Sequence, residues 1–152
     1  MHKIAIFPGS FDPFTLGHFS LVNKALPLYD KIIIAIGQNS TKQPAFNLQK
    51  RVDSLKKLYK KETKVEIVTF TGLTVDLCKK YKAQYILRGL RNGTDFDYEK
   101  AIANMNKKLH SKIETVFFLT DPEHECISST IVREIYKNGG SIRQFLPKGY
   151  TL

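Results

Sequence analysis

The sequence contains no tryptophan and only two cysteines, Cys78 and Cys126. The cysteines lie far apart and match neither a disulfide framework nor a zinc-binding pattern, so we expect no metal-ligating cluster of side chains. No apolar run approaches the roughly 20 residues needed to cross a bilayer. The N-terminus also lacks the small-residue cleavage site of a signal peptide. These absences predict a cytoplasmic protein with no membrane partner.

Acidic residues are scarce. Asp and Glu total 14 against 24 Lys and Arg, which gives a formal net charge of +10. A basic balance indicates anionic partners without saying which, and both nucleic acid and a polyphosphate substrate fit. Much of the charge is predicted to form a solvated face on a helix over 48–61. That face holds Lys50, Arg51, Lys56, Lys57, Lys60 and Lys61.

Strand-like and helix-like segments alternate along the 152 residues, which we expect to form one domain over 1–152. β-Branched runs predict strands, and apolar residues at helical spacing predict helices. The alternation predicts an α/β fold, with one doubly wound parallel sheet of five strands and helices on both faces. Ligands of such sheets bind at the carboxyl ends of the strands. The expected strands are 4–7, 31–37, 65–70, 84–87 and 113–119, and the expected helices are 17–28, 48–61, 74–81, 96–109 and 128–137.

The loop after the first strand runs from Pro8 to His18 and leads directly into a helix. Glycines allow the backbone to approach a ligand closely, and the N–H groups of a helix N-terminus face an anion. The loop is neither G-x-G-x-x-G nor a Walker A motif, so neither a dinucleotide-binding dehydrogenase nor a P-loop NTPase is supported. His18, in the first helical turn, can direct its imidazole at a bound phosphate.

Three further loops at strand ends carry candidate anion ligands. Lys42 follows the second strand, where it is either solvated or a phosphate contact. Arg88 and Arg91 flank Gly89 after the fourth strand and predict an anion clamp, because guanidinium groups match phosphate oxygens. The last helix opens with hydroxyl residues that cap it and can also hold a nucleotide: Ser128, Ser129 and Thr130.

Two of these segments resemble signatures of the nucleotidyltransferase superfamily. T-L-G-H at 15–18 resembles its [HT]-x-G-H motif, and I-S-S-T at 127–130 resembles its second motif. The spacing of P-G-S-F-D-P, R-G-L-R, D-F-D-Y-E and I-S-S-T is similar to that of the phosphopantetheine adenylyltransferases over nearly the whole chain. The resemblance implies a Rossmann-like fold and transfer of AMP from ATP to 4′-phosphopantetheine, which gives dephospho-coenzyme A and pyrophosphate.

The resemblance also implies roles for individual residues. His18 would stabilise the pentacoordinate α-phosphate, with Lys42 and Arg91 completing the catalytic set. The acceptor would contact Ser10, Lys42, Thr74 and Arg88. The residues implied for ATP are Ser10, Phe11, His18, Gly89, Leu90, Arg91, Glu99, His124, Glu125, Cys126, Ile127, Ser128, Ser129 and Thr130. The family uses Mg²⁺ held mainly by ATP phosphates and water, and it is typically a homohexamer.

Three alternatives remain open at this point. A pyridine mononucleotide adenylyltransferase or a cytidylyltransferase shares the first and last motifs, but neither is expected to carry R-G-L-R followed by D-F-D-Y-E. A non-catalytic nucleic-acid-binding module is motivated by the net charge. The sequence disfavours this module, because its aromatic residues are not spaced along a basic groove and it carries no named nucleic-acid-binding signature.

Overall fold

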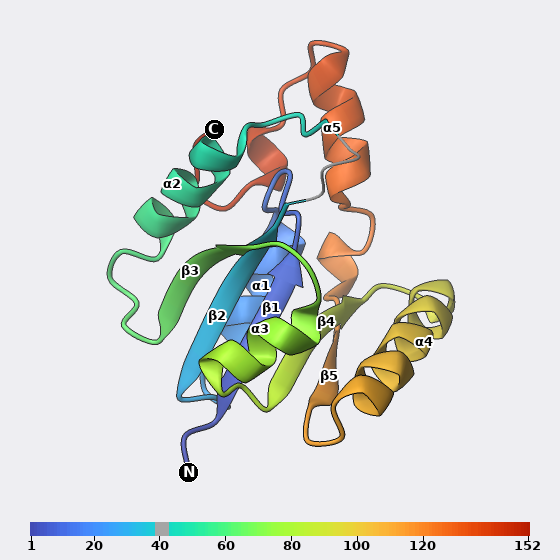
Figure 1. Cartoon of the computed structure of the whole chain (residues 1–152). Helices are drawn as coiled ribbons and strands as arrows, with labels where there is room; N and C mark the ends of the chain where they lie inside the picture. Colours follow the sequence, from blue (N-terminus) through green and yellow to red (C-terminus); the bar gives the residue numbers. More distant parts are fainter. Residues whose placement is uncertain (39–42) are drawn as a thin grey trace.

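The computed structural model describes residues 1–38 and 43–152. Five parallel strands form one sheet in the order β3-β2-β1-β4-β5, with the helices packed around it (Figure 1). This confirms the predicted doubly wound α/β fold. The strands are β1 (Ile4–Gly9), β2 (Lys31–Gly37), β3 (Val65–Phe70), β4 (Tyr85–Leu90) and β5 (Glu114–Leu119). The α-helices are α1 (Leu16–Ala25), α2 (Leu48–Leu58), α3 (Thr74–Tyr81), α4 (Gly93–Leu109) and α5 (Ser129–Lys137), with short 3₁₀ helices at Pro122–His124 and Arg143–Phe145.

Each face of the sheet buries its own core. Alternate residues of a strand point to opposite faces, so Ile32 and Ile34 of β2 join one core and Ile33 joins the other. The first core is closed by α1 and α2, and the second by α3. Since both faces are covered, β2 reads as an unbroken apolar run. Within 1–38 and 43–152, no helix has the length and apolar character of a membrane span.

Several element ends differ from the prediction. β4 continues to Leu90, so Arg88, Gly89 and Leu90 belong to the strand and not to the loop after it. α4 begins at Gly93, earlier than expected, because the Asn92 side chain caps it by accepting a hydrogen bond from the Asp95 N–H at 2.9 Å. This early start brings Asp95 into the first turn of the helix, where it contacts Arg91, and Glu99 one turn later contacts Arg88.

Arg51 does not belong to the solvated face predicted for it. The residue is only 5% exposed. Its Nε donates to the Phe46 carbonyl at 2.9 Å, and its Nη1 donates to the Ser10 carbonyl. A guanidinium can be buried when its donors find acceptors, and here the acceptors are loop carbonyls. Arg51 therefore ties the start of α2 to the loop after β1.

The sheet opens at its centre. β1 pairs with β2 from Ile4 through Gly9, yet it pairs with β4 only at Ala5 and Ile6. Beyond that point β1 and β4 diverge, between the two halves of the strand order. In doubly wound sheets this switch point is where ligands bind. In Figure 1, α5 lies beyond the carboxyl ends of the strands, on the side of this opening.

Asp12 fixes the loop that borders the opening. Its carboxylate is 6% exposed and accepts the backbone N–H groups of Ala45 and Phe46, each at 2.9 Å. We expect Asp12→Ala to lower the free energy of unfolding by about 2–4 kcal/mol, since two donors lose a charged acceptor. Urea denaturation measures this. The control is Asp53→Ala on α2, where the carboxylate is exposed and the change should stay within about 0.5 kcal/mol. Equal stability of the two variants would contradict the role of Asp12.

Candidate active site

A cleft of about 580 Å³ lies at the carboxyl ends of the strands, where β1 and β4 diverge. It is bordered by the loop after β1, the start of α1, the ends of β4 and β5, and the starts of α4 and α5. A second cavity of about 250 Å³ adjoins it and contains Thr74 and Asn106. Four residues line both cavities and form the wall between them: Pro8, Gly9, Arg88 and Glu99.

Phe11, in the loop after β1, has an unusual backbone conformation and packs against His18. Its φ of 46° is in the left-handed region, which is uncommon for a residue other than glycine. Its ring is 2% exposed and packs edge-on against His18, with centroids 5.1 Å apart. A Cβ on Gly9 would lie 3.0 Å from this ring, so position 9 must be small. Phe11 lines the cleft but is only 2% exposed, so any contact with ATP uses a small part of its surface.

The geometry around His18 fixes its tautomer. Its Nδ1 accepts the Thr15 N–H at 3.0 Å and lies 3.2 Å from the Thr15 hydroxyl. A backbone N–H can only donate, so Nδ1 carries no proton and the neutral ring carries its proton on Nε2. Burial, followed by the positive charges of Arg88 and Arg91, lowers the pKa of His18 to about 4. His18 is therefore a neutral Nε2–H donor at pH 7.

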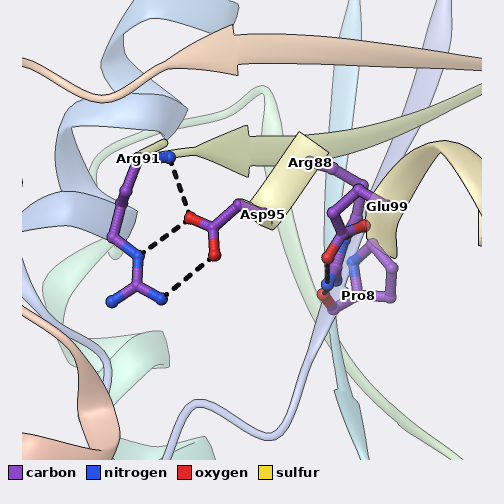
Figure 2. A network of polar contacts seen from close by, with 5 residues as sticks. All are labelled: Pro8, Arg88, Arg91, Asp95 and Glu99. Carbon is purple, nitrogen blue, oxygen red and sulfur yellow. Dashed lines mark hydrogen bonds and ion pairs between the residues drawn. The ribbon is translucent and has the colours of Figure 1, made fainter. Parts of the chain in front are cut away.

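Both predicted clamp arginines are paired with carboxylates of α4 (Figure 2). Arg88 donates to Glu99 through Nε at 2.8 Å and Nη2 at 2.6 Å, and its Nη1 donates to the Pro8 carbonyl at 2.9 Å. Among the described residues, these contacts use three of the five N–H groups of a guanidinium. Two N–H groups remain with which Arg88 can bind a ligand.

Arg91 is paired with Asp95, and this ion pair is more exposed than the one between Arg88 and Glu99. Its Nε donates to Asp95 at 3.1 Å and its Nη2 at 3.4 Å, while its backbone N–H donates to the same carboxylate at 2.9 Å. Desolvation raises the pKa of Asp95, but the hydrogen bonds from Arg91 outweigh it and the pKa is lowered. Asp95 is thus a carboxylate that accepts from Arg91, and it also lies in the first turn of α4.

The glycine between the two arginines has a packing role that the prediction did not include. A Cβ on Gly89 would lie 3.2 Å from Cδ1 of Leu21 on α1, closer than most real contacts. The glycine in R-G-L-R therefore allows α1 to approach the end of β4.

The start of α5 faces the cleft with N–H groups and hydroxyls. The Ser128 side chain accepts the Ile131 N–H at 3.2 Å, as predicted for a cap, and the Ser129 hydroxyl donates to the Pro13 carbonyl at 2.8 Å. Arg133, one turn along, also lines the cleft, and it donates to the Asp12 carbonyl at 2.7 Å. The positive end of the helix dipole and this arginine together favour an anion.

Most predicted site residues meet in the cleft, and some do not. Leu90 is 8% exposed and lies outside the cleft lining, as do His124, Glu125 and Cys126. Thr74 lines the second cavity only, and Lys42 lies outside the described residues. The predicted residues that line the cleft are Ser10, Phe11, His18, Arg88, Gly89, Arg91, Glu99, Ile127, Ser128, Ser129 and Thr130.

Sequence reasoning missed several lining residues. Ser20 and Lys24 follow Gly17 at helical spacing, which places all three on one face of α1 and could have indicated them. Asp121 links the two, accepting Ser20 Oγ at 2.6 Å and Lys24 Nζ at 2.6 Å. Arg133 could have been found by the same spacing from Ser129 and Thr130. Tyr98 and Thr120 carry no comparable signal.

Comparison with known proteins agrees with the resemblance to nucleotidyltransferases. A cytidylyltransferase-like family model matches residues 6–135. The chain is 52% identical over 143 residues to the phosphopantetheine adenylyltransferase of Flavobacterium johnsoniae, covering 94% of this chain and 93% of that protein. It is 48% identical over 153 residues to the phosphopantetheine adenylyltransferase of Pelagibacter ubique, covering 97% and 93%. The chain belongs to the phosphopantetheine adenylyltransferase family.

A solved structure shares the fold of this chain. The chain superimposes with a TM-score of 0.70 on a bifunctional NMN adenylyltransferase/ADP ribose pyrophosphatase from Francisella tularensis. The match covers 99% of this chain and 45% of that one, so this chain spans less than half of its length. At 19% identity, this match shows a common fold and nothing about the substrate.

We predict that His18 stays neutral well below the pH at which a free histidine titrates. Its ring should keep the proton on Nε2 from pH 7 downward and take up a second proton only near pH 4. Long-range ¹H–¹⁵N NMR correlations of the imidazole measure both the tautomer and the titration. A midpoint near the ordinary value of about 6.5, or a proton on Nδ1, would contradict this environment.

Proposed function

We propose that this chain transfers AMP from ATP to 4′-phosphopantetheine, forming dephospho-coenzyme A and pyrophosphate. The proposal depends on the sequence identity of 52% and 48% to phosphopantetheine adenylyltransferases over nearly the whole chain. The cleft, lined by arginines and by the N-terminus of α5, supports it. A pyridine mononucleotide or cytidylyl transfer would need a different acceptor or nucleotide in the same cleft. The positive charge of the cleft serves these phosphates, and we propose no nucleic-acid partner.

The reaction needs no general base, because the attacking group is already anionic. A phosphate oxygen of the acceptor forms a bond to the α-phosphorus of ATP, and the bond from that phosphorus to pyrophosphate breaks. Catalysis then consists of orientation and stabilisation of charge. The Nε2–H of neutral His18 donates to a non-bridging oxygen of the α-phosphate, where negative charge increases in the transition state.

The remaining residues hold the two substrates in line. Arg88, on the wall between the cavities, binds the acceptor phosphate, and Arg91 binds the ATP phosphates with the N-terminus of α5. Ser10 contacts both substrates at the mouth of the loop. The pantetheine arm extends into the second cavity past Thr74. Lys42 is proposed as a further contact of the acceptor phosphate on the family resemblance alone.

Magnesium is proposed to arrive with ATP. No group of three or more His, Cys, Asp or Glu side chains within 1–38 and 43–152 could hold a metal ion. This fits Mg²⁺, which keeps several waters and binds substrate phosphates in preference to a complete protein cage. When bound, the ion neutralises charge on the phosphates. A reducing compartment such as the cytoplasm suits the exposed free thiol of Cys126.

The proposed function is tested by incubating the chain with ATP, Mg²⁺ and 4′-phosphopantetheine and detecting dephospho-coenzyme A by mass spectrometry. We expect product in this tube, and none with nicotinamide mononucleotide or with CTP and glycerol 3-phosphate. His18→Ala should lower kcat by about 10²–10³, the usual effect of removing one transition-state donor. His2→Ala, at an exposed position of the N-terminus, is the matched control. Turnover only in another tube would replace the acceptor and keep the superfamily.

We also propose that six chains assemble, as the family resemblance implies. Large apolar side chains stand exposed along α4 and at the end of the edge strand β5, which supports an interface there. They are Phe96, Tyr98, Ile102, Met105, Leu109 and Leu119.

The expected mass in light scattering is that of six 17.4 kDa chains. Met105 is 58% exposed in the single chain and would be buried in the interface. Met105→Glu should reduce the assembly, because it would bury a charged carboxylate there. Leu28→Glu is the control, since Leu28 is 55% exposed but lies just after α1, away from α4. A single-chain mass for the unmodified protein would refute assembly, and an unchanged mass of Met105→Glu would move the interface away from α4.

A further inference from the structure

Two carboxylates on α4 form ion pairs with two arginines at the end of β4 (Figure 2). We call the two pairs, Arg88–Glu99 and Arg91–Asp95, the rungs of a ladder. Asp95 and Glu99 are four residues apart, so both face β4 from successive turns of the helix. Arg88 and Arg91 meet them from the strand end. The family resemblance assigns Glu99 to ATP, and nothing assigns a role to Asp95.

We propose that Glu99 and Asp95 are positioning residues that orient Arg88 and Arg91, and that Glu99 affects the reaction through Arg88 and not by contacting ATP. This inference rests on the proposed function, because the arginines are taken to hold the two reacting phosphates. Orientation by a fixed partner is a large part of such a reaction, since a small displacement of a contact group can cost about 10²-fold in rate.

The environment of Glu99 supports an indirect role. The residue is 8% exposed, and both of its oxygens accept from Arg88 at less than 3 Å. Arg88 is also fixed from β1, through Nη1 and the Pro8 carbonyl. Three elements thus determine where the guanidinium points before any ligand arrives. A carboxylate engaged at both oxygens is poorly placed to accept further bonds from a nucleotide, and its negative charge would repel phosphates.

The second rung is weaker and more exposed. The Arg91 and Asp95 side chains are 38% and 24% exposed, against 31% and 10% for Arg88 and Glu99. Asp95 contacts both the side chain and the backbone N–H of Arg91, so it fixes the first residue after β4 as well as the guanidinium. We therefore expect the Arg88 rung to have the larger effect on the rate.

Removal of a carboxylate acts on affinity in two opposite ways. It takes away a negative charge near bound phosphates, which favours anion binding, and it frees the guanidinium, which disfavours it. The charge effect is similar in the ground state and the transition state, so it changes kcat little. Loss of orientation lowers kcat. The expected pattern is a lower kcat without weaker ATP binding, whereas a direct contact of Glu99 with ATP predicts weaker binding.

The test compares Glu99→Gln and Asp95→Asn with Asp97→Asn, which removes the same charge from an exposed position of the same helix. We expect kcat to fall about 10-fold to 100-fold in Glu99→Gln, less in Asp95→Asn, and not in Asp97→Asn. Calorimetric titration with ATP alone should give affinities no weaker than that of the unmodified chain. Weaker ATP binding by Glu99→Gln, or an unchanged kcat, would overturn the proposal.

A double-mutant cycle separates orientation from general damage. In an Arg88→Ala background, Glu99→Gln should lower kcat no further, because the group that it orients is gone. An equal decrease in both backgrounds would overturn the proposal. If Glu99→Gln does not fold, the same cycle with Asp95→Asn and Arg91→Ala decides, since that pair is more exposed.

Failure of the proposed function is recognised separately. If the unmodified chain forms no product in any tube, the reaction is wrong. The ladder is then judged on ATP binding alone, where a loss in Glu99→Gln overturns it and an unchanged affinity supports it.

Discussion

The site depends on one interruption in the sheet, the early end of pairing between β1 and β4. The hydrogen-bonded pairing of the neighbouring strands continues to their ends. β1 pairs with β2 through Gly9, and β4 pairs with β5 through Leu90. The gap between β1 and β4 is therefore held open by the sheet itself. Pro8 stands in the gap and has no N–H to offer, while its carbonyl accepts from Arg88. A side chain replaces the missing backbone pairing, and that side chain is the one at the wall of the cleft.

Charge in the cleft differs from charge in the whole chain. The chain carries +10, yet the two arginines at the end of β4 each have a carboxylate of α4 as partner. Compensated arginines keep a defined geometry in the absence of ligand, whereas uncompensated ones would repel each other and spread. Uncompensated attraction for phosphates then comes from the start of α5, with Arg133 and the helix dipole. Affinity for anions and precision of their placement are thus supplied by different elements.

The sequence predicted the alternation of strands and helices because apolar periodicity and β-branched runs are local properties. It also predicted most of the cleft, since His18, Arg88 and Ser128 lie at element ends that a parallel sheet brings together. The sequence did not predict which side chains pair with one another. Glu99 reaches Arg88 because α4 packs beside the end of β4 with Asp95 and Glu99 toward the strand. Arg51 can be buried because loop carbonyls accept its N–H groups. Both depend on how elements pack, which a stretch of charged residues does not reveal.

The arginines that we propose to bind phosphates also influence the chemistry of His18. Burial, together with the charges of Arg88 and Arg91, lowers the pKa of His18 to about 4, so the ring is neutral at pH 7. A phosphate bound beside Arg88 and Arg91 would carry the opposite charge and would raise the pKa of His18 in turn. The Nε2–H would then be polarised more strongly by the phosphate that we propose it contacts. Proton transfer is still not required, because the nucleophile is already anionic and pyrophosphate can leave without a proton from His18. A neutral donor with a fixed tautomer is therefore sufficient, and the Thr15 N–H that fixes it is as much a part of the site as the imidazole.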